Sequence, residues 1–170
     1  MITDVDRAIA AGCHSFVEDV FSNRGWRGRE HEAVSHFAFG FLQRECKAGT
    51  ALSDPTQIVI SGCVPGVPEL NPKGRVNKDL VLWPTPGMSC WNAEWHVKNT
   101  PMAVMEWKIF RAATRPSRMS VYDLHWLQQF SHGRGDFVGY AVSLDLAARG
   151  WRLRVDRVAD GRTDEKWINL

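Results

Sequence analysis

Two short apolar runs decide the fold: residues 77–83, with the sequence NKDLVLW, and residues 103–109, with the sequence AVMEWKI. Each has the length and apolar content of a buried β-strand, yet each carries charged residues. Because side chains two residues apart share one face of a strand, Glu106 and Lys108 are expected to lie side by side. Such charges cost desolvation free energy unless they are paired or bound to a metal ion. The two runs therefore predict a polar site within a sheet.

Asp79, near the start of the first run, can bring a second carboxylate to Glu106. Two carboxylates and a lysine at one edge of a sheet are typical of a Mg²⁺ site that cleaves phosphodiesters. In such a site Asp79 and Glu106 would coordinate the ion, and Lys108 would orient or activate a water molecule. The alternative is a different enzyme in which Glu106 and Lys108 form a structural ion pair.

This arrangement resembles the PD-(D/E)XK nuclease superfamily, in which an Asp on one strand is followed on the next by Glu or Asp, any residue, and Lys. Asp79 and residues 106–108 (EWK) match this pattern, whereas Lys78 stands where a Pro often precedes the Asp. The resemblance covers about residues 27–158. It implies an α/β, restriction-endonuclease-like fold with an αβββαβ core, a central mixed sheet flanked by helices and, here, an extra N-terminal helix.

The resemblance also implies a function. A member of this superfamily would be a Mg²⁺-dependent nuclease acting on DNA, with Mn²⁺ as a substitute ion. The backbone carbonyl of Trp107 and a glutamate on the first core helix would complete the metal site. Many enzymes that cut duplexes need two active sites, so a homodimer is plausible. The rival interpretation is a catalytically inactive nucleic-acid-binding or assembly module on the same fold.

Glu30 and Glu32 are the two candidates for the glutamate that the first core helix would contribute to the metal site. The predicted core face of this helix carries Val34, Phe37 and Phe41. Glu30 lies four residues before Val34 and shares that face, whereas Glu32 lies about 200° further round the helix. We therefore expect Glu30 to reach the metal or its water shell, and Glu32 to be solvated.

The predicted contacts with nucleic acid lie after the third strand. Residues 108–122 contain no acid, and Arg111, Arg115 and Arg118 fall among them, which suits a phosphate backbone or simply a solvated loop. Gln128, on the core side of the following helix, could reach the active site; a partly buried amide bonded to the backbone is the alternative. The earlier loop carries Trp91 and Trp95, which could stack on bases or pack in the core.

The periodicity of the chain predicts one domain over residues 1–170. Helices are expected over residues 3–21, 27–47 and 121–132, and strands over residues 57–64, 78–84, 102–110, 136–146 and 151–158. The last of these strands is an extra closing strand, beyond the predicted αβββαβ core.

The charge, hydropathy and motifs of the chain argue against several classes of protein. A formal charge of +2 is too small to prove a nucleic-acid partner by itself. No apolar run approaches the roughly 20 residues of a membrane span, and the polar start predicts no signal peptide, so we expect a cytoplasmic protein with no membrane partner. The four cysteines show no C-x-x-C spacing and are expected to be reduced. Glycine-rich phosphate loops and a Gly-x-Ser-x-Gly elbow are absent from the sequence.

Overall fold

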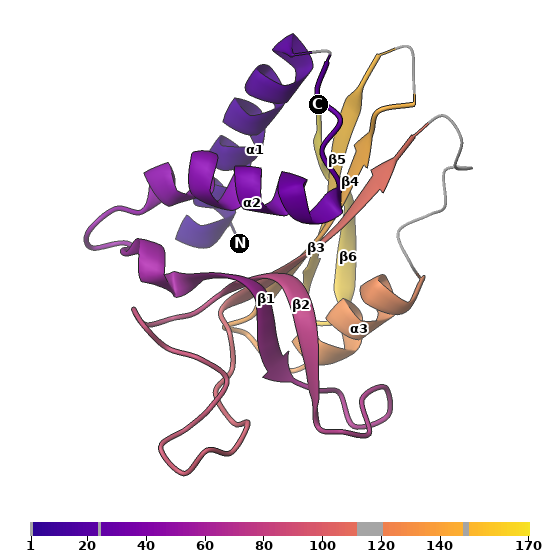
Figure 1. The fold of residues 1–170 in the computed structure, drawn as a ribbon. Coiled ribbons are helices and arrows are strands. Elements are labelled where there is room, and N and C mark those ends of the chain that lie inside the picture. The colour runs from indigo at the N-terminus through magenta and orange to yellow at the C-terminus, as the bar shows by residue number, and fades with distance from the viewer. Residues whose placement is uncertain (1, 24, 112–120, 148–149) are drawn as a thin grey trace.

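A mixed six-stranded sheet forms the centre of the computed structural model, which describes residues 2–23, 25–111, 121–147 and 150–170. The strands lie side by side in the order of the sequence (Figure 1). They are β1 Ile58–Pro65, β2 Arg75–Leu82, β3 Ala103–Phe110, β4 Val138–Asp145, β5 Arg152–Ala159 and β6 Arg162–Asn169. β3 and β4 are parallel, and the other neighbouring pairs are antiparallel.

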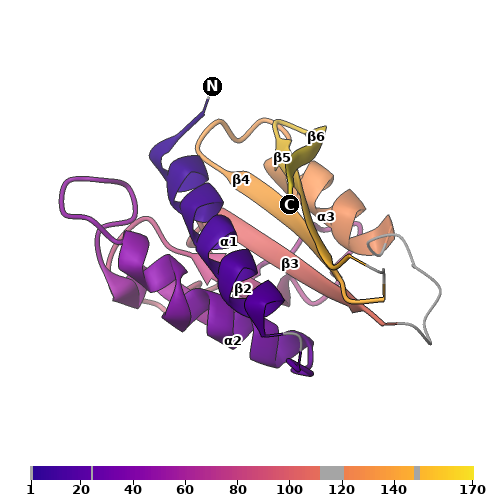
Figure 2. The same ribbon diagram turned by 90° about the horizontal axis from the view of Figure 1, so that it is seen from above.

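Three α-helices cover the two faces of this sheet: α1 Asp4–Ser22, α2 Glu30–Gly40 and α3 Val121–Ser131. α1 and α2 pack on one face and α3 on the other (Figure 2). Two short 3₁₀ turns, η1 Leu42–Glu45 and η2 Pro55–Gln57, connect α2 to β1. This architecture confirms the predicted α/β class, with helices flanking a mixed sheet.

The core divides into two apolar clusters, one under α1 and α2 and one under α3. β3 contributes to both, because its side chains alternate. Met105 and Trp107 lie in the cluster under α1 and α2, whereas Val104 lies in the cluster under α3. Glu106 follows Val104 at a spacing of two residues and contacts Lys78, which lies over Trp126 of α3. The predicted alternation along β3 is therefore confirmed.

α1 begins where the sequence predicts. Thr3 caps it: the Asp6 backbone N–H donates to the Thr3 hydroxyl oxygen at 3.1 Å, and the Asp6 carboxylate accepts from the Thr3 backbone N–H at 2.7 Å. In the described part of the chain, no helix combines the length and the apolar character needed to cross a membrane.

Two element predictions were wrong. The second helix ends at Gly40, not near residue 47, because Phe41 leaves the helical conformation and the chain continues as η1, which buries Leu42. The sixth strand, β6, was missed because it is highly charged and only Ile168 in it is buried. A turn at Asp160 and Gly161, both with positive φ (48° and 73°), joins it to β5 as in a tight hairpin.

Candidate active site

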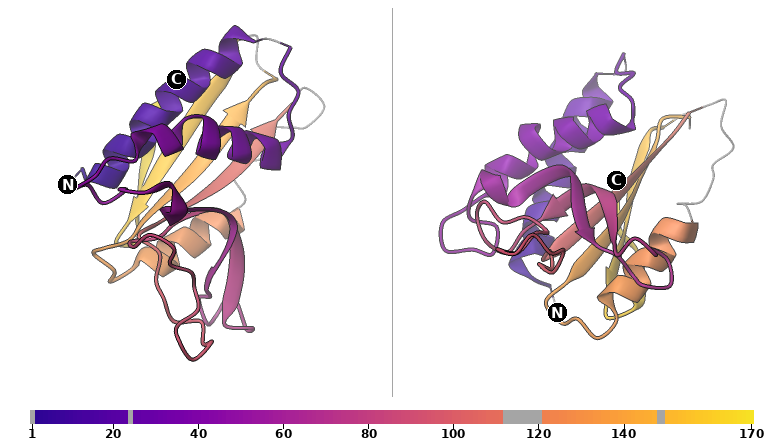
Figure 3. Two further views of the ribbon diagram at one scale, coloured as in Figure 1. Left: turned by 60° about the vertical axis from the view of Figure 1, so that its left-hand side comes forward. Right: turned by 60° about the horizontal axis from the view of Figure 1, so that its bottom comes forward.

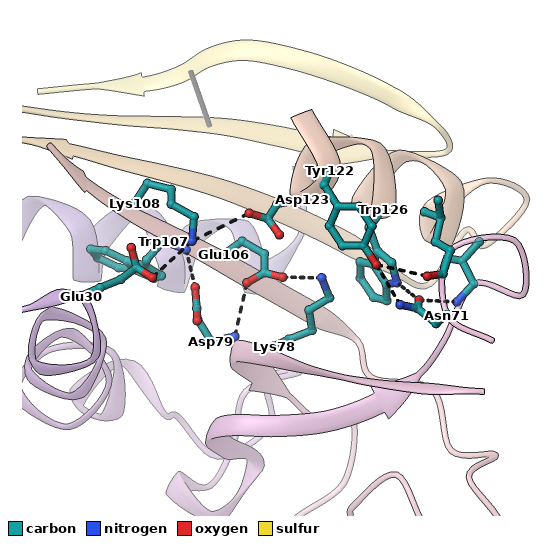
Figure 4. A network of polar contacts seen from close by, with 12 residues as sticks. Glu30, Asn71, Lys78, Asp79, Glu106, Trp107, Lys108, Tyr122, Asp123 and Trp126 are labelled. Atoms are coloured by element: carbon teal, nitrogen blue, oxygen red, sulfur yellow. Dashed lines mark hydrogen bonds and ion pairs between the residues drawn. The ribbon is translucent and has the colours of Figure 1, made fainter. Parts of the chain in front are cut away.

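The candidate site lies where β2 and β3 separate. The two strands pair only between Leu80–Leu82 and Ala103–Met105. Beyond that point the Asp79 side chain lies between them: its Oδ2 atom accepts a 2.8 Å hydrogen bond from the Trp107 backbone N–H. The backbone N–H of Asp79 faces Glu106 Oε2 at 3.4 Å (Figure 4). The Asp79 carboxylate thus takes the place of a backbone hydrogen-bond partner between β2 and β3, and it is held next to Glu106.

β2 is irregular at the position of Asp79. The pairing of β1 with β2 passes from Ile60–Leu80 to Gly62–Lys78, and Ser61, opposite Asp79, has a left-handed φ of 52°. Leu80 belongs to the cluster under α1 and α2. Lys78, two residues away, should share that face, yet it lies over Trp126 of α3. The alternation of β2 therefore breaks at Asp79, and the break brings Lys78 to the face of Glu106.

Lys78 and Glu106 form a buried ion pair. The Lys78 Nζ atom contacts Glu106 Oε1, and the two side chains are only 1% and 6% exposed. Nζ also lies 3.9 Å from the centroid of the Trp126 ring, in cation–π contact. Burial raises the pKa of Glu106 from its ordinary value of 4.5 to about 7; Lys78 opposes this rise, and the negative charges of Asp79 and Asp123 add to it.

A hydrogen-bonded brace holds the Trp126 ring in place. Its Nε1–H donates to Asn71 Oδ1 at 2.8 Å, and the Asn71 side-chain amide donates to the Tyr122 hydroxyl oxygen at 3.0 Å. The same Asn71 oxygen accepts from the backbone N–H of Val67 at 3.0 Å. The turn between β1 and β2 is thereby tied to α3 beside Lys78 (Figure 4).

Lys108 lies on the more open side of the site and is 30% exposed. Its Nζ atom is 3.2 Å from Glu30 Oε1 and 3.8 Å from Asp123 Oδ2. Burial would lower the pKa of Lys108, but the charges of Glu30, Asp79 and Asp123 outweigh this effect and raise it. Lys108 is therefore a charged ammonium group at neutral pH.

The structure separates the two glutamates at the start of α2. Glu30 points to Lys108, whereas Glu32 is exposed and its carboxylate accepts from the backbone N–H of Arg29 as a cap. Arg111 supports this helix start, because its guanidinium donates to the backbone carbonyl oxygens of Arg27, at 3.0 Å, and Gly28.

Of the other residues singled out from the sequence, Trp107 lies at the site and Gln128 lies away from it. Arg115 and Arg118 fall outside the described residues. The Gln128 amide donates to the Thr163 hydroxyl oxygen at 3.0 Å, beside the turn that joins β5 and β6. The main chain of Trp107 pairs in register with Val142 of β4, and its N–H is bound by Asp79.

Sequence reasoning missed two members of this site, Lys78 and Asp123. Strict alternation along β2 would place Lys78 on the face of Leu80, so only the break at Asp79 brings it into the site. Asp123 had a readable signal: it lies three and four residues before Trp126 and Leu127, the buried residues of α3, and so shares their face.

We use the term carboxylate cluster for six side chains: Glu30, Lys78, Asp79, Glu106, Lys108 and Asp123. Four carboxylates and two ammonium groups thus lie together in the described part of the chain. As the side chains stand, no three His, Cys, Asp or Glu residues among those described form a ready metal-binding group. The donor chemistry nevertheless fits a hard divalent cation, which prefers carboxylate oxygens.

We compared the chain with models of protein families, with curated proteins and with solved structures, and none of them matches. The chemistry of the carboxylate cluster is therefore argued from its own residues.

Proposed function

We propose that this protein is a divalent-metal-dependent nuclease of the PD-(D/E)XK kind that acts on DNA. The observation that carries the proposal is the convergence of Asp79, Glu106 and Lys108 where β2 and β3 separate. The order α2, β1–β3, α3, β4 agrees with an αβββαβ core and supports the resemblance.

Asp79 and Glu106 would hold the metal ion, Mg²⁺ or Mn²⁺, with Glu30 and the backbone carbonyl of Trp107 as further ligands. A bound ion of this kind polarises the scissile phosphate and acidifies a water molecule. The hydrogen bond from the Trp107 N–H fixes the Asp79 carboxylate in the gap between the strands. Preorganised ligands of this kind reduce the free-energy cost of binding an ion.

Lys108 supplies a positive charge in addition to that of the metal ion. Its ammonium is partly exposed, so a phosphate group can approach it, and Glu30 and Asp123 hold it on the side of β3 that carries Glu106. There it orients the attacking water molecule and stabilises the negative charge that develops on the phosphate oxygens. Glu30 and Asp123 act on the reaction by positioning this ammonium.

The proposal also includes contacts with the nucleic acid. Arg111 supports the start of α2, and Arg115, Arg118 and Gln128 remain proposed contacts. Trp95 is the better candidate for base stacking: it is 78% exposed and lies between Trp91 and Val97, which form an isolated bridge. These residues belong to the long loop between β2 and β3 (Figure 3). The Trp95 φ of 59° is unfavourable for a bulky residue, and a 3.0 Å hydrogen bond from its N–H to the Asn92 carbonyl oxygen holds it there.

Incubation with nucleic acids tests the proposal. Supercoiled plasmid, linear duplex, single-stranded DNA and RNA are each mixed with the protein and Mg²⁺ or Mn²⁺. We expect cleavage of DNA that EDTA abolishes and that Glu106→Gln lacks. Glu69→Gln, which removes an exposed carboxylate from the turn between β1 and β2, is the matched control and should cut like the parent. Equal cutting by Glu106→Gln would contradict the proposed site.

One observation favours the second candidate, a non-catalytic binding or assembly module. The buried pair of Lys78 and Glu106 fills part of the site, as a structural ion pair would. Such a module would bind DNA equally well with and without divalent metal, and none of the four nucleic acids would be cleaved.

A further inference from the structure

Lys78 is too deeply buried to meet a substrate. Its side chain is 1% exposed, compared with 30% for Lys108, and it is enclosed by the Glu106 carboxylate and the face of the Trp126 ring. A phosphate group in solution can reach Lys108 but not Lys78. Any effect of Lys78 on the reaction must therefore act through Glu106, which makes it a positioning residue.

Lys78 occupies a position that a metal ion needs. It contacts Glu106 Oε1, while Oε2 faces only the backbone N–H of Asp79, at 3.4 Å, among the described contacts. A divalent ion bound between Asp79 and Glu106 would lie close to the Lys78 ammonium. Two cations at one buried carboxylate repel each other strongly, because the surrounding dielectric is low.

The displaced Lys78 ammonium can stay on the face of the Trp126 ring. Its face lies 3.9 Å from Nζ, and Asn71 fixes the ring through the 2.8 Å bond to its Nε1–H. A cation on the face of a buried indole retains a favourable interaction after it leaves a carboxylate. Lys78 could thus withdraw from Glu106 without having to reach solvent.

We propose that Lys78 is a built-in counter-cation of Glu106, and that a divalent ion binds by displacing its ammonium from this carboxylate. The inference rests on the metal site proposed above and deepens it. The ammonium compensates the buried carboxylate while the ion is absent, and it weakens the binding of the ion by competing with it. Metal occupancy is thereby limited to conditions in which the ion is abundant.

Calorimetric titration with Mn²⁺ tests this exchange in the full-length protein. Lys78→Met keeps the length and apolar stem of the side chain but removes its charge. We expect it to bind Mn²⁺ at least about tenfold more tightly than the parent protein, because a nearby positive charge is lost. Lys73→Met removes an exposed lysine from the turn between β1 and β2 and should leave the affinity unchanged.

The outcomes separate this inference from the metal site itself. Equal Mn²⁺ affinity in the parent and Lys78→Met would overturn the exchange, while loss of binding in Glu106→Gln would still support the site. Absence of Mn²⁺ binding in every variant would overturn the site and the exchange with it.

A second measurement does not depend on the folding of Lys78→Met. NMR of the parent protein with labelled lysine follows the Nζ and Cε signals during a Mg²⁺ titration. The Lys78 signals should shift in a saturable way as the ammonium leaves Glu106, and those of Lys73 should not. Saturable Mg²⁺ binding with static Lys78 signals would contradict the proposal.

Discussion

Two acid–base clusters of the described residues differ in their exposure: the one around Asp6 is buried under α1, whereas the carboxylate cluster opens to solvent at Glu30 and Lys108, which are 39% and 30% exposed. Under α1, the Asp6 carboxylate is 0% exposed and accepts from the Tyr140 hydroxyl at 2.7 Å, the Arg157 Nε–H at 2.6 Å and the Thr3 N–H at 2.7 Å. The buried carboxylate thus has hydrogen-bond donors from three residues. Such a cluster is suited to stability and not to ligand binding.

The carboxylate cluster draws its side chains from α2, β2, β3 and α3 and is more open. Four carboxylates share two ammonium groups, and one of these, Lys108, is 30% exposed. The carboxylates repel one another, since the charges of Asp79 and Asp123 help to raise the pKa of Glu106, and a bound cation would relieve this repulsion. The contrast shows that burial of charge alone does not identify a functional site, whereas several carboxylates gathered around a partly exposed lysine are a better indication.

The largest effect is expected from Asp79→Asn. The amide oxygen can still accept from the Trp107 N–H, but it is a poor metal ligand, so cleavage should fall by at least about 100-fold. The free energy of unfolding should be unchanged or higher, because the repulsion between Asp79 and Glu106 is lost. Plasmid cleavage and urea denaturation measure the two quantities; a large loss of stability would show that Asp79 is mainly structural.

Asp6→Asn should give the opposite pattern. It removes the carboxylate that Arg157 contacts and should lower the free energy of unfolding by about 2–4 kcal/mol. The folded fraction should cut DNA at the parent rate, since Asp6 lies on the other side of the sheet. Urea denaturation and cleavage by folded protein test this, and a loss of activity with unchanged stability would reverse the roles of the clusters.

The clusters should also respond oppositely to pH. Burial would raise the pKa of Asp6, but its bonds with Arg157, Thr3 and Tyr140 lower it overall, so its stabilisation is present above the unfolded-state value of 3.8 and is lost on acidification. The pKa of Glu106 rises from 4.5 to about 7, so its contribution is present below 4.5 and is lost as the pH rises through 7.

Denaturation in EDTA from pH 3 to pH 8 measures this difference. Relative to Glu106→Gln, the parent protein should lose stability between about pH 5 and pH 7. Relative to Asp6→Asn, it should lose stability only as the pH falls below about 4. Parallel curves for the parent and Glu106→Gln would show that Glu106 is fully compensated within the chain.

The smallest effect is expected at the edge of the carboxylate cluster. Glu30→Gln weakens the hold on Lys108 and should lower turnover about tenfold. Glu32→Gln, its matched control in the same helical turn, alters only the cap of α2 and should leave turnover nearly unchanged. Steady-state cleavage rates compare the two variants; the reverse order would assign the site to Glu32.

Much of this arrangement could be predicted from the sequence. The apolar runs at residues 77–83 and 103–109 predicted two adjacent strands, and the period of two predicted the shared face of Glu106 and Lys108. Helical spacing correctly distinguished Glu30 from Glu32 as the residue that faces the sheet. These predictions succeed because each depends on one regular element and its own period.

The remainder depended on irregularities and long-range packing. The face on which Lys78 lies follows from a break in the alternation of β2 at Asp79, opposite the left-handed Ser61. No periodic pattern in the sequence predicts this break. Gln128 was expected to reach the active site, yet its amide bonds to Thr163 and the carboxylate of Asp123 lies near Lys108 instead. β6 was missed because a charged edge strand lacks the apolar alternation of an interior strand.

A crystal grown or soaked with Mn²⁺ tests the central claim most directly, because the anomalous signal of the ion locates it independently of activity. We expect one peak in contact with both Asp79 and Glu106, with the Lys78 ammonium withdrawn from Glu106 Oε1. A Mn²⁺-saturated crystal with no peak at these carboxylates and with the pair of Lys78 and Glu106 intact would contradict the account.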